Sequence, residues 1–318
     1  MKQRSNETAR EALDYMTIPP LRDAMFQHTN YGYSNLGAHY SVTELLRSPR
    51  TVQLQHRYRE EIAALPFDHD KILKNKASFK GTAIHNHFEK CLYQFMNQNR
   101  QKGYIIERRI WDRICDRKIS GKFDCFLNGA MYDFKTCSIW KAIFPDHTEW
   151  EQQLNLYAYL MHTCGVEVTI LFILAWYMDW DKEKLWKDPA YPRDDIDLIH
   201  IENLWTPKTQ QEFLHDRIEA QKKNEPLSDE DLDPCTPEEM WSKPDVFAVM
   251  RPGQKRAVCA KDMFSQAKAE GWIANSKQKD KDTFYIQHRP GGRTKCEEYC
   301  HVAPWCNIHQ EYLKTVKK

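Results

Sequence analysis

Two aspartates and a lysine lie in one short alternating segment, Ile119–Thr136, and could together hold a metal ion. Asp124 precedes an Asn-Gly pair at 128–129, and Asp133 and Lys135 follow it. Asn-Gly between alternating residues predicts a two-residue type I′ hairpin, because both turn positions need a positive φ. In that register the two aspartates face one another, with Cβ atoms about 5 Å apart.

Alternation sorts the hairpin into an apolar face and a charged face. The apolar face is formed by Phe123, Cys125, Leu127, Ala130, Tyr132 and Phe134. On the charged face, two carboxylates repel by about 4 kcal/mol at 4 Å and an effective dielectric constant of about 20. Such a pair favours a bound cation, and Mg²⁺ or Mn²⁺ suits hard oxygen ligands. The alternative is an exposed polar strand face with an Asp–Lys ion pair.

The hairpin, with two further motifs, resembles the core of the PD-(D/E)XK nucleases. Downstream, Gln153–Tyr157 matches the QxxxY motif of the RecB-like branch, and upstream, Gly81–Glu89 resembles its helical histidine motif. The motifs occur in the family's order, at family-like separations, within Ser41–Tyr177. The nearest relatives by this resemblance are phage-type RecB-like exonucleases and the related CRISPR-adaptation nucleases.

The resemblance implies a role for each matched position. The implied ligands of a divalent metal are His85, Asp124, Asp133, the backbone carbonyl of Phe134 and, as a further candidate, Glu89. Lys135 would orient or help deprotonate the attacking water, while Gln153 and Tyr157 would steady the active site and the nucleic-acid backbone. The implied reaction is metal-assisted phosphodiester hydrolysis. Phe123 departs from the proline that the family often has before its first aspartate.

Ten cysteines suggest a second metal centre near the C-terminus. Cys296, Cys300 and Cys306 lie within eleven residues, and Cys235 is a fourth candidate. This set resembles the iron–sulfur site of RecB-like nucleases, although its first gap is one residue longer and Ser48 stands near the expected upstream cysteine. A 4Fe–4S cluster is implied, with tetrahedral zinc or no metal as alternatives. Buried thiols are expected at the remaining cysteines: Cys91, Cys115, Cys125, Cys137, Cys164 and Cys259.

The net charge is only +1, yet the charge is unevenly distributed. Asp181–Asp245 holds 18 acidic against 9 basic residues, whereas Arg251–Lys318 holds 14 basic against 7 acidic. A nuclease must neutralise phosphates near its cleft. The DNA-binding candidates are Arg47, Arg50, Arg57, Lys255 and Arg256. Ordinary solvated surface is the alternative for each.

Hydrophobic periodicity and turn signals predict an α/β fold with three parts. We expect an N-terminal arm over 1–40, a RecB-like nuclease core over 41–226 and a small cysteine-stapled α+β module over 227–318. In the core, a central mixed sheet would be flanked by helices. The expected helices are a first region from Ser41 to Ala63, interrupted at Pro49, then Gly81–Asn97, Glu149–His162, Pro207–Lys223 and Met263–Gly271. The expected strands outside the hairpin are Tyr104–Asp116, Val166–Tyr177, Val246–Met250, Arg256–Cys259 and Phe284–His288.

Composition places the 318-residue chain among soluble globular proteins, with 41% hydrophobic and 29% charged residues. No apolar run approaches the roughly 20 residues that cross a bilayer, and the polar N-terminus lacks the apolar core of a signal peptide. We therefore expect a cytoplasmic protein of a bacterial or phage-infected cell, without a membrane partner.

The predicted function is a Mg²⁺- or Mn²⁺-dependent DNA nuclease. The resemblance favours an exonuclease of DNA recombination, repair or phage DNA metabolism, with a helicase or recombination protein as a candidate partner. The alternative is a non-catalytic DNA-binding or adaptor protein with a nuclease-like fold. The sequence leaves open exonuclease against endonuclease action, strand preference, polarity and oligomeric state.

Overall fold

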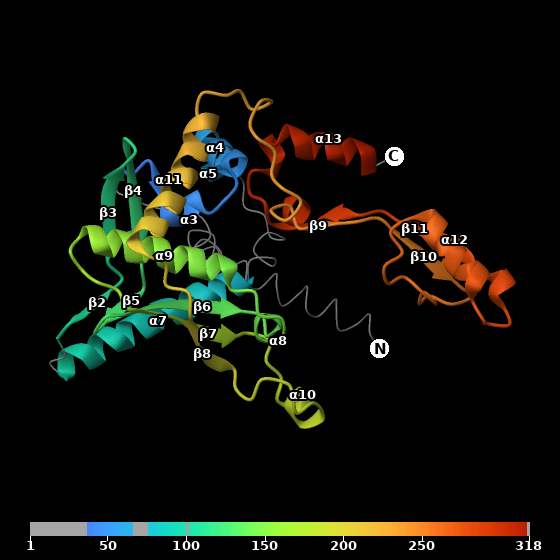
Figure 1. Cartoon of the computed structure of the whole chain (residues 1–318), viewed down its shortest axis with the longest axis horizontal. Helices are drawn as coiled ribbons and strands as arrows, with labels where there is room; N and C mark the ends of the chain where they lie inside the picture. The colour runs from blue at the N-terminus through green and yellow to red at the C-terminus, as the bar shows by residue number, and fades with distance from the viewer. Residues whose placement is uncertain (1–36, 66–75, 100–101, 317–318) are drawn as a thin grey trace. The chain divides into compact units, whose positions relative to one another are not determined.

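The computed structural model describes residues 37–65, 76–99 and 102–316, which divide into two compact units (Figure 1). Unit 1 comprises the described residues of Met1–Leu46 and Ala63–Ala220, and unit 2 those of Arg47–Ile62 and Gln221–Lys318. The predicted N-terminal arm lies outside the described residues up to position 36. The predicted boundaries at 41 and 227 differ from this division, chiefly because residues 47–62 belong to unit 2.

Unit 1 is built on a five-stranded mixed sheet, which confirms the predicted α/β class. Its strands, in spatial order, are β2 (Tyr104–Ile106), β5 (Cys125–Leu127), β6 (Ala130–Cys137), β7 (Ile170–Tyr177) and β8 (Ile196–Ile201). Only β6 and β7 run parallel; the other neighbours are antiparallel. The connection from β6 to β7 therefore needs a crossover, and a helix supplies it.

The predicted hairpin is confirmed in turn type and register. Leu127 pairs with Ala130 and Cys125 with Tyr132. Asn128 and Gly129 have φ values of 49° and 88°, the positive values that a type I′ turn requires.

A three-stranded sheet of β1 (Tyr40–Ser41), β4 (Arg117–Lys122) and β3 (Arg109–Ile114) is the second sheet in the described residues of unit 1. The single strand expected over Tyr104–Asp116 is therefore wrong. Glu107 has a φ of 50°, and the chain leaves the five-stranded sheet there and enters the three-stranded sheet. Redirection at this residue also brings its side chain into the site described below.

Helices cover the five-stranded sheet (Figure 1). On one face, α7 (Lys76–Gln98) packs Phe88, Leu92 and Met96 against Phe134 and its apolar neighbours on β5 and β6. The crossover helix α9 (Thr148–Thr163) packs against β6 and also against β3 and β4. The remaining helices of this unit are α3 (Val42–Leu45), α8 (Trp140–Ile143), α10 (Lys182–Lys187) and most of α11 (Pro207–Asn224).

The predicted helix start at Ser41 is confirmed by a capping box. The backbone N–H of Glu44 donates to the Ser41 hydroxyl at 3.2 Å, and the N–H of Ser41 donates to the Glu44 carboxylate at 2.8 Å. The reciprocal bonds satisfy backbone donors at the helix start.

Unit 2 contains short elements around two small apolar clusters. Its helices and strands are α4 (Pro49–Arg57), α5 (Arg59–Ala63), β9 (Ser242–Lys243), β10 (Val246–Met250), α12 (Gln266–Asn275), a 3₁₀ turn (Lys281–Thr283), β11 (Tyr285–Arg289), β12 (Gly292–Arg293), a π-helical turn (Lys295–Tyr299), a 3₁₀ turn (Ala303–Trp305) and α13 (Asn307–Val316). Leu54, Leu232 and Val302 form one cluster, which explains why residues 47–62 group with the C-terminal part. The strand expected over Arg256–Cys259 is reduced to an isolated bridge between Cys259 and Val249.

The cysteines expected to be buried differ in exposure. Cys125 is buried, while the thiols of Cys115, Cys137 and Cys259 are partly buried. Cys91 and Cys164 are exposed, so the expectation is wrong for these two. Within the described ranges, each helix falls short of the length and hydropathy that membrane crossing requires.

Candidate active site

Three side chains from separate elements converge in unit 1. His85 comes from α7, Glu107 follows β2, and Asp124 lies in the bend between β4 and β5. The Nε2 atom of His85 lies 2.9 Å from Oδ1 of Asp124 and 3.3 Å from Oε1 of Glu107. One ligand atom from each residue lies within 4.8 Å of the other two. The arrangement is a cluster of two carboxylates and one imidazole.

Asp124 reaches this cluster by leaving the hairpin ladder. Strand pairing ends at Cys125, so the predicted cross-strand pair of Asp124 and Asp133 does not form. Instead, the backbone N–H of Phe134 donates to Oδ2 of Asp124 at 2.6 Å. This bond fixes the carboxylate and leaves Oδ1 directed at His85. The carbonyl of Phe134 stays a predicted ligand.

A chain of polar contacts holds Lys135 in place beside the cluster of His85, Glu107 and Asp124. Its Nζ lies 2.5 Å from Oδ2 of Asp133 and donates to Oε1 of Gln153 at 3.0 Å. The Gln153 amide in turn donates to the Tyr157 hydroxyl at 2.9 Å. Gln153 and Tyr157 lie one turn apart on α9, so this helix fixes the direction of the ammonium group.

Burial and crowding of charge shift the pKa values in this region. Burial raises the pKa of Asp133, against the effect of the neighbouring Lys135. Burial likewise raises the pKa of Glu107, although Lys122 opposes it. For His85, the hydrogen bond to Asp124 raises the pKa and outweighs burial. The groups therefore take up protons more readily than free side chains do, and a bound cation would relieve the same excess of negative charge.

The Lys135 ammonium is the favoured form at neutral pH. Burial disfavours its charge, but Asp133 above all, with Asp124 and Glu149, raises the pKa of Lys135 overall.

The donor set fits a divalent metal ion. Oε1 of Glu107 and Oδ2 of Asp133 are buried and make no hydrogen bond of regular geometry in the described part of the chain, although Nε2 of His85 lies 3.3 Å from the first and Nζ of Lys135 lies 2.5 Å from the second. Buried carboxylates are costly unless cations offset their charge, and a metal ion would add to the charge of these two side chains. The expected ligand Glu89 is outside the three-residue cluster. The second carboxylate of the cluster, besides that of Asp124, comes from Glu107. Glu107 was missed because only its place after a short apolar strand marks it in the sequence.

Two hollows meet at this cluster. One, of about 210 Å³, is lined by Ser41, Val42, Thr43, His85, Glu107, Arg109, Ser120, Gly121, Lys122, Asp124 and Tyr157. The other, of about 520 Å³, is lined by Gly81, Thr82, His85, Asn86, Lys122, Phe134, Lys135, Thr136 and Trp176. His85 and Lys122 line both hollows. The carboxylates of Glu107 and Asp124 line the smaller hollow, whereas the ammonium groups of Lys122 and Lys135 line the larger one.

Gly121 permits the close contact that positions Tyr157. A Cβ atom at residue 121 would lie 2.8 Å from Cδ1 of Tyr157 and 3.0 Å from Cδ1 of Leu160. We expect Gly121→Ala to lower the free energy of unfolding by about 1–3 kcal/mol through overpacking. Gly271→Ala is the control, because that α12 position has open space and alanine favours a helix. Urea denaturation of both variants measures the effect, and equal stability of the two would contradict it.

The four C-terminal cysteines gather in unit 2. The pKa of Cys296 is raised to about 11 by burial and then by the nearby thiolates of Cys300, Cys235 and Cys306. Within the residues that the structure describes, all four are free thiols, and no three of their sulfurs lie within 4.8 Å of one another. The Cys235 thiol donates to the hydroxyl of Ser48 at 3.2 Å.

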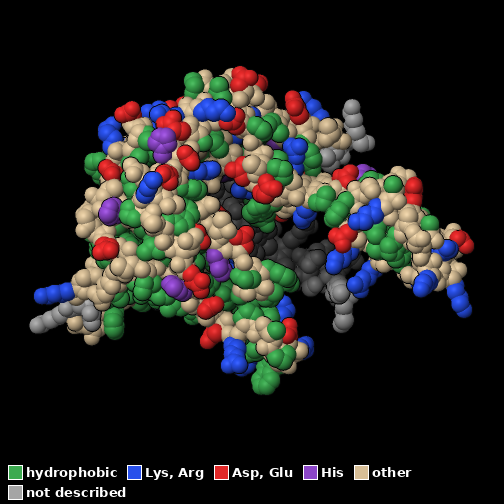
Figure 2. All heavy atoms as spheres, in the orientation of Figure 1, with side chains coloured by type: hydrophobic (Ala, Val, Ile, Leu, Met, Phe, Trp, Pro, Cys, Tyr) green, Lys and Arg blue, Asp and Glu red, His purple; other side chains and the backbone are tan. Residues whose placement is uncertain are grey.

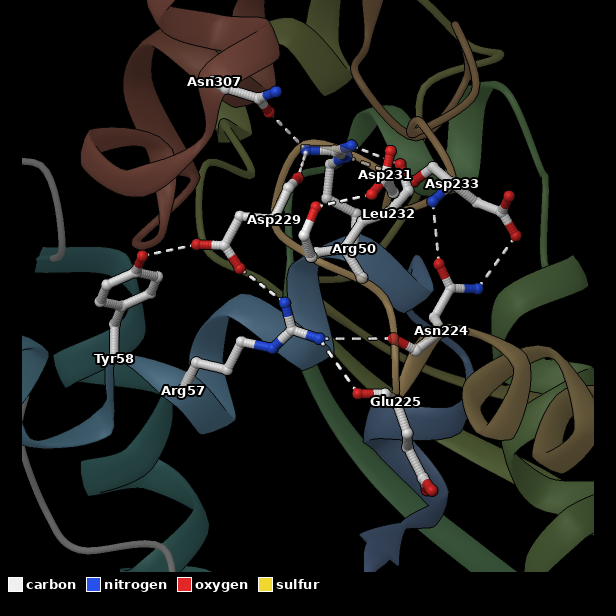
Figure 3. Close-up of polar contacts among 11 residues, drawn as sticks. Arg50, Arg57, Tyr58, Asn224, Glu225, Asp229, Asp231, Leu232, Asp233 and Asn307 are labelled. Atoms are coloured by element: carbon white, nitrogen blue, oxygen red, sulfur yellow. Dashed lines mark hydrogen bonds and ion pairs between the residues drawn. The ribbon is translucent and has the colours of Figure 1, made fainter.

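Arg50 and Arg57 make polar contacts that join separate segments of unit 2 (Figure 3). Arg50 is only 2% exposed and donates to the carbonyl oxygens of Asp229 and Asp233. The Nη1 atom of Arg57 lies 2.6 Å from Oδ1 of Asp229. The DNA-binding expectation is wrong for Arg50, which is inaccessible, and Arg57 already has a carboxylate partner.

The other predicted DNA-binding residues are exposed. These are Arg47, Lys255 and Arg256, all in unit 2. On the molecular face drawn in Figure 2, acidic and basic side chains are interspersed rather than gathered into one basic field. The three residues stay predictions.

Comparison with known proteins identifies no family. No family model matches the chain, and no curated protein matches its sequence. Among solved structures, the crystal structure of SSO0001 is similar, with 18% identity and a TM-score of 0.44, over 65% of this chain and 87% of that one. A candidate exonuclease from Eubacterium rectale has 17% identity and a TM-score of 0.37, over 62% of this chain and 86% of that one.

Proposed function

We propose that this chain is a metal-dependent DNA nuclease that hydrolyses phosphodiester bonds in unit 1. The observation that carries the proposal is the convergence of His85, Glu107 and Asp124, with the ammonium of Lys135 fixed beside them. Clusters of carboxylates beside a fixed cation suit phosphoryl chemistry, in which positioning and charge stabilisation contribute most of the catalysis.

Each side chain has a role that follows from its contacts. The proposed ligands of the metal are His85, Glu107, Asp124 and Asp133. A divalent ion in this place would lower the pKa of water and offset negative charge on the phosphate. Lys135 is protonated, so it orients water or a phosphate oxygen rather than accepting a proton. Gln153 and Tyr157 hold that ammonium in place.

An exposed aromatic pair supports an unpaired strand end as the substrate. Trp140 and Phe144 are 58% and 67% exposed and stack with centroids 5.6 Å apart. Trp140 begins α8, which follows the strand that carries Lys135. Aromatic faces stack on unpaired bases without sequence preference, so we propose exonuclease action. Arg47, Lys255 and Arg256 are proposed DNA-backbone contacts.

The biological setting is carried by the motif resemblance. The proposed process is DNA recombination, repair or phage DNA metabolism in the cytoplasm. A helicase or recombination protein is the proposed partner.

A nuclease assay on linear, circular and end-blocked DNA tests the proposed activity. We expect linear DNA to be degraded with Mg²⁺ or Mn²⁺, EDTA to stop the reaction, and end-blocking to protect an exonuclease substrate. Asp124→Asn should lower the rate at least about 100-fold by removing a charged ligand. Asp194→Asn, at an exposed position, is the control. DNA binding without cleavage under every metal would favour the adaptor alternative.

We further propose that Cys235, Cys296, Cys300 and Cys306 hold a 4Fe–4S cluster. Cys300, Cys235 and Cys306 lie close enough to Cys296 to raise its pKa, which supports one shared centre for the four sulfurs. The choice of iron–sulfur over zinc rests on the motif resemblance. The cluster would tie the C-terminal segment to the rest of unit 2, a structural role.

Moving one sulfur tests this assignment. Cys235→Ser should lose most bound iron and sulfide, because three thiolates hold the cluster poorly. The double variant Ser48→Cys/Cys235→Ser should recover it, since the Ser48 hydroxyl lies 3.2 Å from the Cys235 sulfur. Iron and sulfide analysis with visible absorbance measures the outcome, and Cys164→Ser is the exposed-thiol control. Stoichiometric zinc without iron would instead favour the zinc alternative.

A further inference from the structure

A second cluster of metal-ligating groups lies in unit 1, apart from the proposed nuclease site. Cys115, His215 and Glu219 each present one donor atom, and the three atoms lie within 4.8 Å of one another. Their donors are a thiol sulfur, an imidazole nitrogen and a carboxylate oxygen. These are the donor types that zinc takes from proteins, and none of the three residues belongs to the nuclease motifs.

The fold fixes all three donors from two rigid elements. His215 and Glu219 lie four residues apart on α11 and therefore share one face of the helix. Cys115 lies in the two-residue turn between β3 and β4, where Ile114 pairs with Arg117. The metal would join this turn to α11.

The turn itself is unusual for a cysteine. Cys115 has a φ of 49° and Asp116 a φ of 59°, so both turn residues are left-handed. Asparagine, aspartate and glycine tolerate that conformation, whereas other side chains adopt it at a cost of about 1–3 kcal/mol. A cysteine kept in this conformation despite the cost points to a role for its sulfur, which a bound ion would supply.

We propose that Cys115, His215 and Glu219 bind a zinc ion that joins the β3–β4 turn to α11. Three protein ligands leave a fourth position for water, and His215, with a side chain 54% exposed, keeps the site open to solvent. The thiol must lose its proton when the ion binds, and that proton passes to solvent. The site does not depend on the proposed nuclease activity.

Alkylation of Cys115 tests the site without interference from other metal centres. Iodoacetamide labelling of the full chain, quantified by peptide mass spectrometry, follows this thiol separately from the other nine cysteines. With Zn²⁺ present, labelling of Cys115 should slow at least about tenfold, because the metal-bound sulfur is shielded. Cys164, exposed in the same unit, is the internal control and should label at an unchanged rate.

Removal of the partner ligands distinguishes the site from binding to the thiol alone. His215→Ala and Glu219→Gln should each raise the Zn²⁺ concentration that half-protects Cys115 from labelling at least about tenfold. Both positions are on a helix surface, and circular dichroism checks that the variants fold. Cys115 labelling that is unaffected by Zn²⁺ in the natural chain would overturn the proposal. So would protection that survives both substitutions.

Discussion

Lys135→Met should lower the rate of DNA hydrolysis about 10²- to 10³-fold, the largest effect that we expect from one substitution outside the metal ligands. The ammonium lies 2.5 Å from Asp133 and 3.0 Å from Gln153, so its position is fixed before substrate binds. Methionine keeps the length of the side chain and removes the charge. Single-turnover cleavage of linear DNA measures the loss, which should fall on kcat more than on KM.

The same substitution should also destabilise unit 1, because it leaves Asp133 buried without its cation. Asp133→Asn in the Lys135→Met background removes the uncompensated charge, so it should recover most of the stability and none of the activity. Lys208→Met, at a side chain 84% exposed, is the matched control and should change neither property. Cleavage at the natural rate by Lys135→Met would contradict the assigned role.

The hairpin could be predicted from the sequence because its information is local. Asn128 and Gly129 determine the turn, and alternation around them assigns each side chain to a face. The QxxxY spacing likewise predicts Gln153 and Tyr157 one turn apart on one helix, because residues four apart share a helix face. The hydrogen bond between them, and the one from Lys135 to Gln153, come from the structure and not from the pattern.

The rest of the site depends on contacts that no local pattern encodes. Glu107 enters the cluster because the chain turns at a positive φ between two sheets, which periodicity cannot show. The Asp124 carboxylate accepts a hydrogen bond from the backbone N–H of Phe134, and Asp124 does not continue the strand pairing. A sequence pattern pairs residues along a strand, whereas a metal cluster is formed where strands end and bend.

Burial by residues far away in the sequence explains why the prediction of DNA binding by Arg50 is wrong. Its sequence neighbourhood is a polar helix, and arginine in such a helix is commonly exposed. The partners of Arg50 lie far away along the chain, with separations of 183 residues from Asp233 and 257 residues from Asn307. The segment from Asn224 to Pro234 encloses the guanidinium.

Arg50→Met should lower the stability of unit 2 by about 3–5 kcal/mol, the cost of removing one partner from a buried charged network. The guanidinium donates to the carbonyl oxygens of Asp229, Leu232 and Asp233 and to the amide oxygen of Asn307 (Figure 3). The Leu232 carbonyl, which is buried, and the three partly buried acceptors would each lose this donor.

Hydrogen exchange of the full chain measures this loss where it should occur. Amides of residues 224–235 should exchange faster in Arg50→Met, because the loop that encloses the side chain opens more often. Arg59→Met is the matched control, since Arg59 is exposed and lies in the same unit. If Arg50 instead bound DNA, its removal would weaken DNA binding and reduce the salt dependence of the DNA affinity by about one phosphate contact. Amide hydrogen exchange of residues 224–235 would then be unchanged. The buried network predicts the reverse, with faster exchange in this loop and the same salt dependence as in the natural chain.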